Sequence, residues 1–460
     1  MTRLFGTNGI RGVVNQDMNS MLALDIGQAW GTHLKKTIAH PRVALGTDAR
    51  LSNHMLKHAI SAGLLSTGCD VVDMGLVPTP ALQYAVKQQD YHSGVVITAS
   101  HNPPEFNGIK GIDRDGTEFS KDTEEDIEHI YFSRSFHLVD WKEVGQYSTW
   151  DGALDLYRQG ILNVIDAESI RHRRLHVVLD CGHGAGSVVT PRLLRELGCT
   201  VTELFCTPDG RFPGRPSEPL PENLGKLMQT VVEVGADCGV AQDGDADRAI
   251  FIDENGRYLW GDKTLCLVAN AILAEQPHGI AVTPVTSSTA FDEVVQKHGA
   301  TVIHTKVGSP IVARVMIQHH AVFGGEENGG LIFPELQYCR DSAMTIAKIL
   351  EIMSKEKRTL SSLVDELPQY ETFKIKVYCP NDKKTLLIDT LVLEMKENPE
   401  VVSVDTTDGL KLFMKDGWVL LRPSGTEPIF RVYAESKSKQ RAQDLATRYK
   451  QRTESVLQQI

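Results

Sequence analysis

The sequence predicts a four-domain protein of the α/β class: three α/β domains with mixed sheets and a smaller α+β domain at the C-terminus. Its 460 residues exceed what a single hydrophobic core usually fills, so several domains are expected. Short β-type runs alternate with helix-length amphipathic stretches over the first three quarters of the chain, the pattern of α/β domains with largely parallel strands. After residue 369 the alternation gives way to paired strand-like runs typical of an antiparallel sheet.

The first predicted domain covers residues 1–150, and its strands and helices alternate. Strands are expected at 43–48, 69–75 and 94–100, and helices at 52–66 and 78–89. The second predicted domain covers residues 151–253. Its expected elements are strands at 175–181 and 200–205, a helix at about 187–197, and a Pro/Gly-rich connection at 207–223.

The third predicted domain covers residues 254–368, with strands near 280–286, 301–307 and 321–324 separated by helices. The fourth covers residues 369–460 and changes to an α+β order. Its expected elements are strands at 373–379, 409–415, 418–424 and 429–436, a helix near 382–396, and a charged helix from 438. Loop composition sets these boundaries, since no clean linker separates the domains.

Charge and cysteine usage exclude several classes of partner. The chain carries 48 Lys and Arg against 59 Asp and Glu, a net charge of -11, without a block of like charges, so nucleic acid is disfavoured. The eight cysteines are scattered and form no C-x-x-C pair, which predicts reduced thiols in a cytoplasmic protein. We find neither a signal-peptide pattern nor 18 uninterrupted apolar residues, so no membrane association is expected.

The segment Thr98-Ala99-Ser100-His101-Asn102-Pro103-Pro104 follows an apolar strand-like run. The carboxyl edge of an α/β sheet is where ligands usually bind, so Ser100 is a candidate nucleophile beside a polar partner. An ordinary turn of Ser, Asn and Pro is the alternative. A serine-hydrolase interpretation fits less well, because no G-x-S-x-G pattern surrounds Ser100.

The sharpest motif is Asp243-Gly244-Asp245-Ala246-Asp247-Arg248. Its three carboxylates repel one another unless a cation joins them, and their alternation points them to one side of an extended loop. Mg²⁺ fits such a site, because three monodentate carboxylates leave coordination positions of the ion open for a phosphate oxygen. An EF-hand also places acids here and at Glu254, but it needs Gly where Arg248 stands and a helix where AIFID predicts a strand. A solvated acidic turn is the remaining alternative.

The segment Arg422-Pro423-Ser424-Gly425-Thr426-Glu427-Pro428 lies between two expected strands of the last domain. Gly425 permits close backbone approach, and the hydroxyls of Ser424 and Thr426 supply donors for a dianion. Arg422, with Arg431 nearby, adds positive charge, so the loop resembles a phosphate site. A plain hairpin turn is the alternative.

Two glycine-rich loops have a weaker chemical signal. In the loop at 325–330, Glu326 and Asn328 have the groups to bind the vicinal hydroxyls of a sugar, although a flexible turn would read the same. The loop at 181–186 suggests a nicotinamide-cofactor fingerprint, but Ser187 stands where its third glycine or alanine belongs. A tight strand-to-helix turn explains this second loop.

Taken in order along the chain, these motifs resemble those of the α-D-phosphohexomutase family. The resemblance extends over the whole chain, through FGTNGIRG (5–12), TASHNPPEFNGIK (98–110), DGDADR (243–248), GEENGG (325–330) and RPSGTEP (422–428). It implies three related α/β domains and a smaller C-terminal domain around a central cleft.

The resemblance also implies roles for individual residues. Ser100 would be the phosphoserine, and with it Asp243, Asp245 and Asp247 would hold one Mg²⁺ per chain. Lys110 would be the general acid/base, and Arg11, His101 and Arg248 would contact the phosphoryl group. The loop with Arg422, Ser424, Gly425, Thr426 and Arg431 would hold the phosphate that is not transferred, and Glu326 and Asn328 would hold the sugar.

The implied reaction moves a phosphoryl group within a hexose phosphate by way of a bisphosphorylated sugar. The opening motif and the length resemble the phosphoglucosamine mutase branch, so glucosamine phosphate is the expected substrate, with mannose or glucose phosphate as the alternative. Asn328, Gly330 and Ser309 depart from residues common in the family, which bears on the choice of sugar. A metal-dependent phosphohydrolase with Asp243 as nucleophile is the alternative of another class. A monomer or homodimer is expected, with a hexose bisphosphate as a candidate activator.

Overall fold

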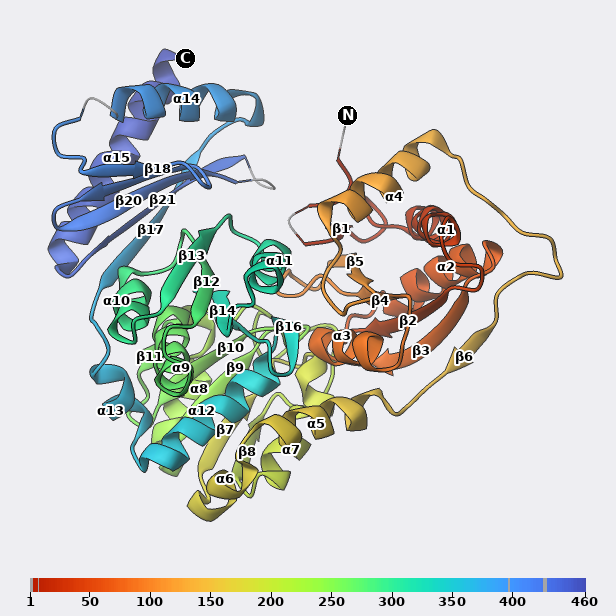
Figure 1. The fold of residues 1–460 in the computed structure, drawn as a ribbon, viewed down its shortest axis with the longest axis horizontal. Helices are drawn as coiled ribbons and strands as arrows, with labels where there is room; N and C mark the ends of the chain where they lie inside the picture. The colour runs from red at the N-terminus through yellow and green to blue at the C-terminus, as the bar shows by residue number, and fades with distance from the viewer. Residues whose placement is uncertain (1–2, 7, 396–397, 425–427) are drawn as a thin grey trace. The chain divides into compact units, whose positions relative to one another are not determined.

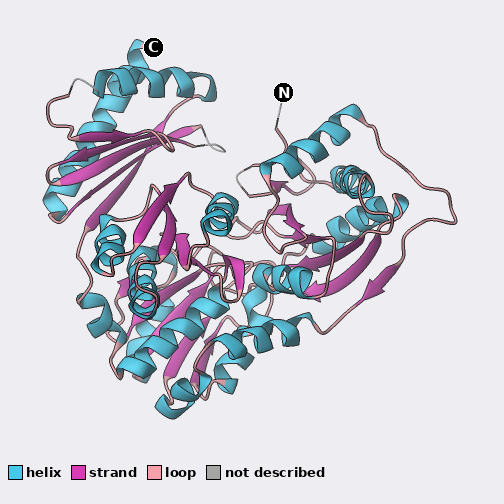
Figure 2. Cartoon of the chain, in the orientation of Figure 1, coloured by secondary structure: helices cyan, strands magenta, loops and turns pink. Residues whose placement is uncertain are grey.

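The computed structural model describes residues 3–6, 8–395, 398–424 and 428–460 of the chain. These residues form two compact units. The first unit contains residues 1–264 and 328–364, and the second contains residues 265–327 and 365–460. Figure 1 labels the elements along the chain, and Figure 2 shows that helices flank strands in both units.

The first unit begins with a six-stranded sheet in the order β1-β5-β4-β2-β3-β6. Its strands are β1 (Ile10–Val13), β2 (Arg42–Thr47), β3 (Asp70–Leu76), β4 (Ser93–Ile97), β5 (Phe106–Asp113) and β6 (Tyr147–Thr149). Its helices are α1 (Ser20–Lys35), α2 (Asn53–Ser66), α3 (Thr79–Gln88) and α4 (Lys121–Ser133). Strands β4, β2, β3 and β6 run parallel to one another, whereas β5 is antiparallel to both β4 and β1.

Helices cover both faces of this first sheet (Figures 1 and 2). On one face, Trp30 of α1 and Ile60 of α2 pack in one buried cluster with Val95 of β4. On the other face α3 lies so close that a Cβ atom at Gly94 would approach Val86 to 2.7 Å. Because β2 and β4 are parallel neighbours, the loops that follow them meet at the same sheet edge.

A second sheet of the first unit has the order β11-β10-β9-β7-β8. Its strands are β7 (His176–Asp180), β8 (Thr200–Leu204), β9 (Cys238–Gln242), β10 (Ala249–Asp253) and β11 (Tyr258–Leu259). The helical segments around it are α5 (Ala153–Val164), α6 (Ala167–Arg173), η1 (Ala185–Val188), α7 (Thr190–Glu196), η2 (Pro221–Asn223) and α8 (Gly225–Val234). Strand β7 is parallel to β8 and β9, and β10 turns back antiparallel to β9. The predicted metal loop is the turn between β9 and β10.

The first unit ends with an antiparallel hairpin and two helices. These elements are β15 (Gly330–Phe333), β16 (Gln337–Arg340), α12 (Ser342–Glu356) and α13 (Leu360–Asp365). Helix α12 contacts β10 and β15, so the hairpin is tied to the strand that follows the metal loop.

The second unit contains three parallel strands followed by an antiparallel sheet. The parallel strands pair in the order β13-β12-β14, with β12 (Ile280–Pro284), β13 (Thr301–Thr305) and β14 (Phe323–Glu326). The helices near them are α9 (Gly261–Glu275), α10 (Thr289–Lys297) and α11 (Ser309–His319).

The antiparallel sheet of the second unit has the order β17-β21-β20-β19-β18. Its elements are β17 (Glu371–Tyr378), η3 (Asn381–Lys383), α14 (Lys384–Met395), β18 (Ser403–Asp405), β19 (Leu410–Met414), β20 (Gly417–Pro423), β21 (Ile429–Ser436) and α15 (Lys439–Gln459). Helices α14 and α15 lie over one face of the sheet, where Leu391 and Leu445 pack with Val432 (Figure 1).

The predicted α/β class with mixed sheets and an α+β C-terminal part is confirmed, and one predicted helix is wrong in detail. In place of a single helix at 187–197, the chain forms η1 and α7 as separate segments. The break lies at Val189, whose φ of -131° is not helical. Pro191 is consistent with the break, because it has no N–H to donate to the carbonyl oxygen of Ser187, four residues earlier, as a continuous helix would require.

All eight cysteines are free thiols, as expected. No helix in the described part of the chain combines the length and apolar composition that crossing a lipid bilayer requires.

Candidate active site

Ser100 lies in the loop that follows β4, at the carboxyl edge of the first sheet. Its side chain is fully buried, and its backbone has a φ of 50°, in the left-handed region. A residue other than glycine pays about 1–3 kcal/mol for such a conformation, so surrounding contacts must hold it. Its N–H donates to Thr98 Oγ1 over 2.8 Å, and Thr98 in turn donates to Asp48 Oδ2 over 2.7 Å.

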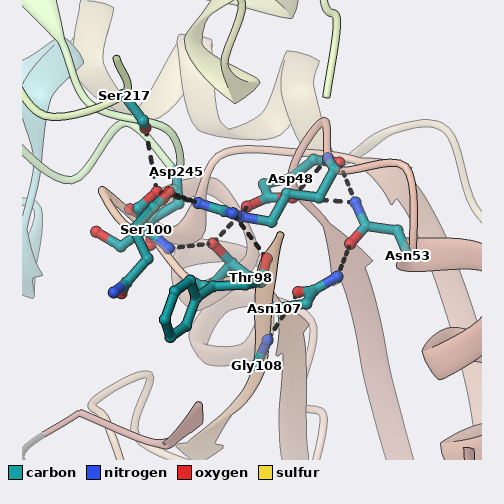
Figure 3. A network of polar contacts seen from close by, with 12 residues as sticks. Asp48, Asn53, Thr98, Ser100, Asn107, Gly108, Ser217 and Asp245 are labelled. Atoms are coloured by element: carbon teal, nitrogen blue, oxygen red, sulfur yellow. Dashed lines mark hydrogen bonds and ion pairs between the residues drawn. The ribbon is translucent and has the colours of Figure 1, made fainter. Parts of the chain in front are cut away.

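Arg50 fixes the backbone of the Ser100 loop. It follows β2, its side chain is fully buried, and it pairs with Asp48 over 3.1 Å. Its guanidinium donates to four carbonyl oxygens of the loop region, those of Ser100, Asn102, Pro103 and Phe106. Figure 3 shows the resulting network around Ser100, with Asp48 and Thr98 beside it. The sequence motifs did not point to Asp48 or Arg50. The available signal was an Asp-x-Arg segment directly after a strand.

The three aspartates predicted to bind metal lie together. One carboxylate oxygen from each of Asp243, Asp245 and Asp247 lies within 4.8 Å of the others, and all three residues are buried. Ser100 Oγ donates to Asp243 Oδ2 over 2.9 Å, so the serine borders this group. The strand β10 begins directly after Arg248, as predicted from AIFID, and this excludes the EF-hand interpretation.

Burial and mutual repulsion make this group of carboxylates a candidate cation site. Burial, together with the charges of Asp247 and Asp245, raises the pKa of Asp243 to about 8. Near neutral pH Asp243 is therefore not readily ionised unless a cation balances its charge. Both oxygens of Asp243 already accept hydrogen bonds, Oδ1 from the backbone N–H groups of Asp247 and Arg248 and Oδ2 from Ser100.

Asp245 and Asp247 each leave one oxygen open. Asp245 Oδ2 accepts from Thr79 Oγ1 over 2.6 Å and from Lys110 Nζ over 3.0 Å, and Asp247 Oδ2 accepts from Arg340 Nη2 over 2.5 Å. The Oδ1 atom of each is buried without a hydrogen-bond partner among the described residues. Unpaired buried oxygens are costly, and they are the ligands that Mg²⁺ prefers. The residues present therefore fit a bound Mg²⁺ ion.

Lys110 lies on β5 and is buried among acidic groups. Its Nζ is 3.0 Å from Asp245, 3.4 Å from Glu118 and 3.6 Å from Asp247. Burial alone would lower the pKa of Lys110, but the charges of Asp245 and Glu118 outweigh it and raise that pKa. Lys110 therefore stays protonated next to the aspartates that border Ser100.

The other predicted contacts of the phosphoryl group lie around Ser100. His101 Nδ1 is 3.3 Å from Ser100 Oγ, and Arg11 Nη1 donates to Asn102 Oδ1 over 2.9 Å. Arg248 Nε lies 3.9 Å from Asp243 and is buried without a hydrogen-bond partner among the described residues. Burial, with the charges of Arg248 and Arg11, lowers the pKa of His101 to about 2, so its imidazole is neutral.

The glycine-rich loop after β7 serves packing. A Cβ atom at Gly184 would lie 2.7 Å from the Gly244 carbonyl oxygen, and one at Gly186 would lie 2.1 Å from the side chain of Gln242. At Gly182, a Cβ atom would meet the guanidinium of the buried Arg215 at 2.7 Å. These contacts explain the glycines as a tight turn against the metal loop, and the nicotinamide-cofactor interpretation is not needed.

The two residues predicted to bind the sugar belong to different units. Glu326 ends β14 in the second unit, is buried, and accepts from the backbone N–H of Gly308 over 3.2 Å. Asn328 belongs to the first unit and accepts from the N–H of Gly330 over 3.1 Å.

The predicted phosphate loop carries a row of basic residues on three strands. Arg422 of β20 is the cross-strand partner of Arg431 of β21, which in turn faces Lys376 of β17. Directly opposed residues share one face of a sheet, so the three cations lie side by side. Lys376 was missed by our motif search, because only the strand pairing brings it to the loop.

Asp408 is a further residue that motif reasoning missed. Its Oδ2 atom accepts from Arg422 Nε over 2.7 Å and from the backbone N–H of Val307 over 2.9 Å. Ser424 is buried and its N–H donates to the Ile429 carbonyl over 3.0 Å. Gly425 and Thr426 lie outside the described residues.

The domains of one enzyme family match this chain from end to end. The phosphoglucomutase/phosphomannomutase alpha/beta/alpha domains I, II and III match residues 2–138, 155–256 and 260–370, and the C-terminal domain matches residues 375–451. The chain belongs to the phosphoglucomutase/phosphomannomutase family. This membership confirms the resemblance to α-D-phosphohexomutases and makes the protein an isomerase.

Individual relatives agree with this family but differ in the sugar that their names give. The mutase is 48% identical over 445 residues to a phosphoglucomutase/phosphomannomutase of Thermococcus kodakarensis, covering 96% of this chain and 97% of the relative. It is 41% identical over 445 residues to a probable phosphoglucosamine mutase of Methanopyrus kandleri, covering 97% and 96% of the two chains.

A solved structure shows the same fold over the whole length. The crystal structure of a phosphoglucomutase/phosphomannomutase family protein of Burkholderia thailandensis superimposes on the mutase with a TM-score of 0.88 at 29% identity, covering 98% of this chain and 97% of the other. Phosphohexomutases use Mg²⁺, and the buried group of Asp243, Asp245 and Asp247 fits such an ion. Because the chain belongs to a family of isomerases, the family membership favours an isomerase over the alternative of a metal-dependent phosphohydrolase.

Proposed function

We propose that this mutase interconverts glucosamine 6-phosphate and glucosamine 1-phosphate through a phosphoserine at Ser100 and a bisphosphorylated sugar. The observation that carries the proposal is the surroundings of Ser100 Oγ. This hydroxyl is fixed on a strained backbone, borders three buried aspartates, and has Lys110 and Arg248 near the same carboxylates. Phosphoryl transfer needs mostly positioning and charge neutralisation, which these groups supply.

In the first half-reaction, the bond between phosphorus and Ser100 Oγ breaks and a bond to a sugar hydroxyl forms. In the second, the other phosphate of the bisphosphorylated sugar returns to Ser100. When bound, Mg²⁺ neutralises charge on the phosphoryl oxygens. Arg11, His101 and Arg248 would contact the same oxygens, and the neutral imidazole of His101 would act through its hydrogen bond to Oγ.

Lys110 is the proposed acid/base, because each half-reaction adds a proton to one oxygen and removes a proton from another. Without a bound cation, the aspartates hold a proton on Lys110. Neutralising Asp245 and Asp247 would leave burial, which lowers the pKa of an ammonium group, opposed by Glu118 and no longer by the two aspartates. Lys110 would then be able to exchange its proton during transfer.

The second unit would hold the rest of the substrate. The row of Arg422, Arg431 and Lys376 supports a site for the phosphate that is not transferred, with Ser424 and the neighbouring Gly425 and Thr426 as hydrogen-bond donors. Under this proposal each predicted domain has one task. Residues 1–150 carry the phosphoserine, 151–253 the metal loop, 254–368 the sugar loop and 369–460 the phosphate loop.

Glucosamine phosphate is proposed as the sugar because the carboxylate of Glu326 would favour an amino group, with Asn328 binding hydroxyls. The Methanopyrus relative, named as a probable phosphoglucosamine mutase, supports this choice. The Thermococcus relative supports the alternative substrates, mannose and glucose phosphates. A cytoplasmic enzyme, monomeric or homodimeric, with one Mg²⁺ per chain, completes the proposal.

The test is an assay of the purified protein against the 1- and 6-phosphates of glucosamine, glucose and mannose. The expected result is the highest kcat/KM for glucosamine phosphates. A higher kcat/KM for glucose or mannose phosphate would overturn the sugar assignment and leave the reaction class intact. Adding a hexose bisphosphate to dephosphorylated enzyme should restore activity by loading Ser100.

A further inference from the structure

Arg340 is a buried cation at the metal site that no motif pointed to. It ends β16, its side chain is 4% exposed, and its Nη2 atom donates to Asp247 Oδ2 over 2.5 Å. We propose that Arg340 is a positioning residue that fixes the metal ligand Asp247, and that Gly330 is glycine so that the Arg340 side chain can reach it. The proposal rests on the proposed use of Asp247 as a metal ligand, not on the choice of sugar.

The space at Gly330 supports the second half of this inference. A Cβ atom there would lie 2.2 Å from Arg340 Cδ and 2.9 Å from Cγ, distances at which the arginine would have to move. Gly330 does not have the left-handed φ that Gly329 next to it has, so other residues can adopt its backbone conformation. Glycine at this position is therefore explained by the room that Arg340 takes up.

The hydrogen bond to Arg340 determines which oxygen of Asp247 is left for an ion. Oδ2 is occupied by Arg340 and lies 3.6 Å from Lys110 Nζ, while Oδ1 is buried with no hydrogen-bond partner among the described residues and lies 3.7 Å from Arg248 Nε. A buried guanidinium whose stem packs against Gly330 restricts rotation of the carboxylate about its Cβ–Cγ bond. Loss of a group that orients a metal ligand in this way typically weakens metal binding by about 10–100-fold.

Two physical effects of Arg340 have opposite signs, and this makes the inference testable. As a positive charge it repels a divalent cation, so its removal would tighten binding. As an anchor of Asp247 it presents a ligand, so its removal would weaken binding. Lysine would retain the charge without the planar fork that holds the carboxylate.

The experiment measures Mn²⁺ binding to the full-length protein by electron paramagnetic resonance, with Mg²⁺ as competitor. Arg340→Met and Gly330→Ala should each weaken Mn²⁺ binding by about tenfold or more, and Arg340→Lys should recover only part of the loss. In the Arg340→Met background, Gly330→Ala should add no further loss of Mn²⁺ affinity, because the guanidinium that holds Asp247 is already gone. Thermal unfolding of each variant shows whether it is folded.

Matched controls separate this effect from a general loss of packing. Gly225→Ala places a methyl group where nothing lies within 4 Å, and Arg192→Met removes an exposed guanidinium; both should bind Mn²⁺ as the wild type does. Equal or tighter Mn²⁺ binding by folded Arg340→Met would overturn the anchoring role. Additive losses in the double variant would overturn the link between Gly330 and Arg340. Absence of Mn²⁺ binding by the wild type would instead refute the metal site.

Discussion

Ser100 combines a strained backbone with a hydroxyl that borders the metal site. Its φ of 50° is held by hydrogen bonds from Arg50 and Ser217 to its carbonyl oxygen and from its own N–H to Thr98. Strain at a position held this firmly is typical of functional residues, because it fixes the direction of one side chain. Two substitutions of Ser100 distinguish the role of its hydroxyl from that of its backbone conformation.

We expect both Ser100→Ala and Ser100→Gly to lose at least about two orders of magnitude in turnover, because the covalent route is gone. Ser100→Gly should be more stable than Ser100→Ala by about 1 kcal/mol, since glycine adopts the left-handed region freely. Coupled assays and urea unfolding measure the two effects, and intact-mass analysis should find phosphate on Ser100 of the wild type. Full activity in either variant would refute the mechanism.

Asp245 is the carboxylate on which Lys110 and Thr79 converge. Asp245→Asn removes one of the three charges that hold the cation, so Mg²⁺ affinity and turnover should both fall by at least about tenfold. Isothermal titration with Mg²⁺ measures the first quantity. The exposed Asp151→Asn serves as control for the charge change, and unchanged affinity in Asp245→Asn would show that the metal lies elsewhere.

At the scale of an element, helix α4 shows how burial and capping interact. Ser120 caps its N-terminus by accepting from the N–H of Thr123, and Glu124 lies in its first turn, buried beside Arg3. Burial raises the pKa of Glu124 from 4.5 to about 7, in spite of Arg3. In the folded protein the carboxyl therefore binds a proton more tightly than in the unfolded chain.

A pH dependence of stability follows for this helix. The contribution of Glu124 to stability is complete below pH 4.5 and is lost as the pH rises through about 7, because only the unfolded state then ionises freely. The free energy of unfolding of the wild type should thus decrease over this interval relative to Glu124→Gln. Denaturant unfolding at several pH values tests this, and parallel curves for the two proteins would contradict it.

At the scale of the whole molecule, each unit joins loops that are distant in sequence. In the first unit Thr79, Ser100, Lys110 and Arg340 all reach the aspartates of one turn. In the second, Asp408 joins Arg422 to the backbone of Val307, so that the phosphate loop and the loop after β13 are held together. The proposed choice of sugar can be tested at Glu326 of the second unit.

Glu326→Gln should lower kcat/KM for glucosamine phosphate about tenfold more than for glucose phosphate, because it removes a charge beside the amino group. Glutamine can still accept from the Gly308 N–H, so the loop is expected to keep its structure. The neighbouring Glu327→Gln is the control, since Glu327 is engaged by Thr286 and lies 3.6 Å from Lys374. Equal losses on both sugars would mean that Glu326 contacts a shared hydroxyl.

The sequence by itself determined the class of fold, and it predicted the nucleophile candidate and the candidate metal ligands. These features are local: an apolar run predicts a strand such as β4, and Ser100 follows it directly. Three aspartates at alternate positions repel one another, and this favours a shared cation. The family motifs then assigned Lys110, Arg11 and Arg248, which lie near these groups as described.

Only the tertiary structure revealed Arg50, Arg340, Lys376 and Asp408, because each acts through partners far away along the chain. Arg340 lies 93 residues from Asp247, and Val307 lies 101 residues from Asp408. A single arginine after a strand has no local signature, and its role depends on which strands pair and on which glycine leaves it room. Periodicity and motifs specify what a segment can form or bind, whereas packing specifies which distant side chain completes the site.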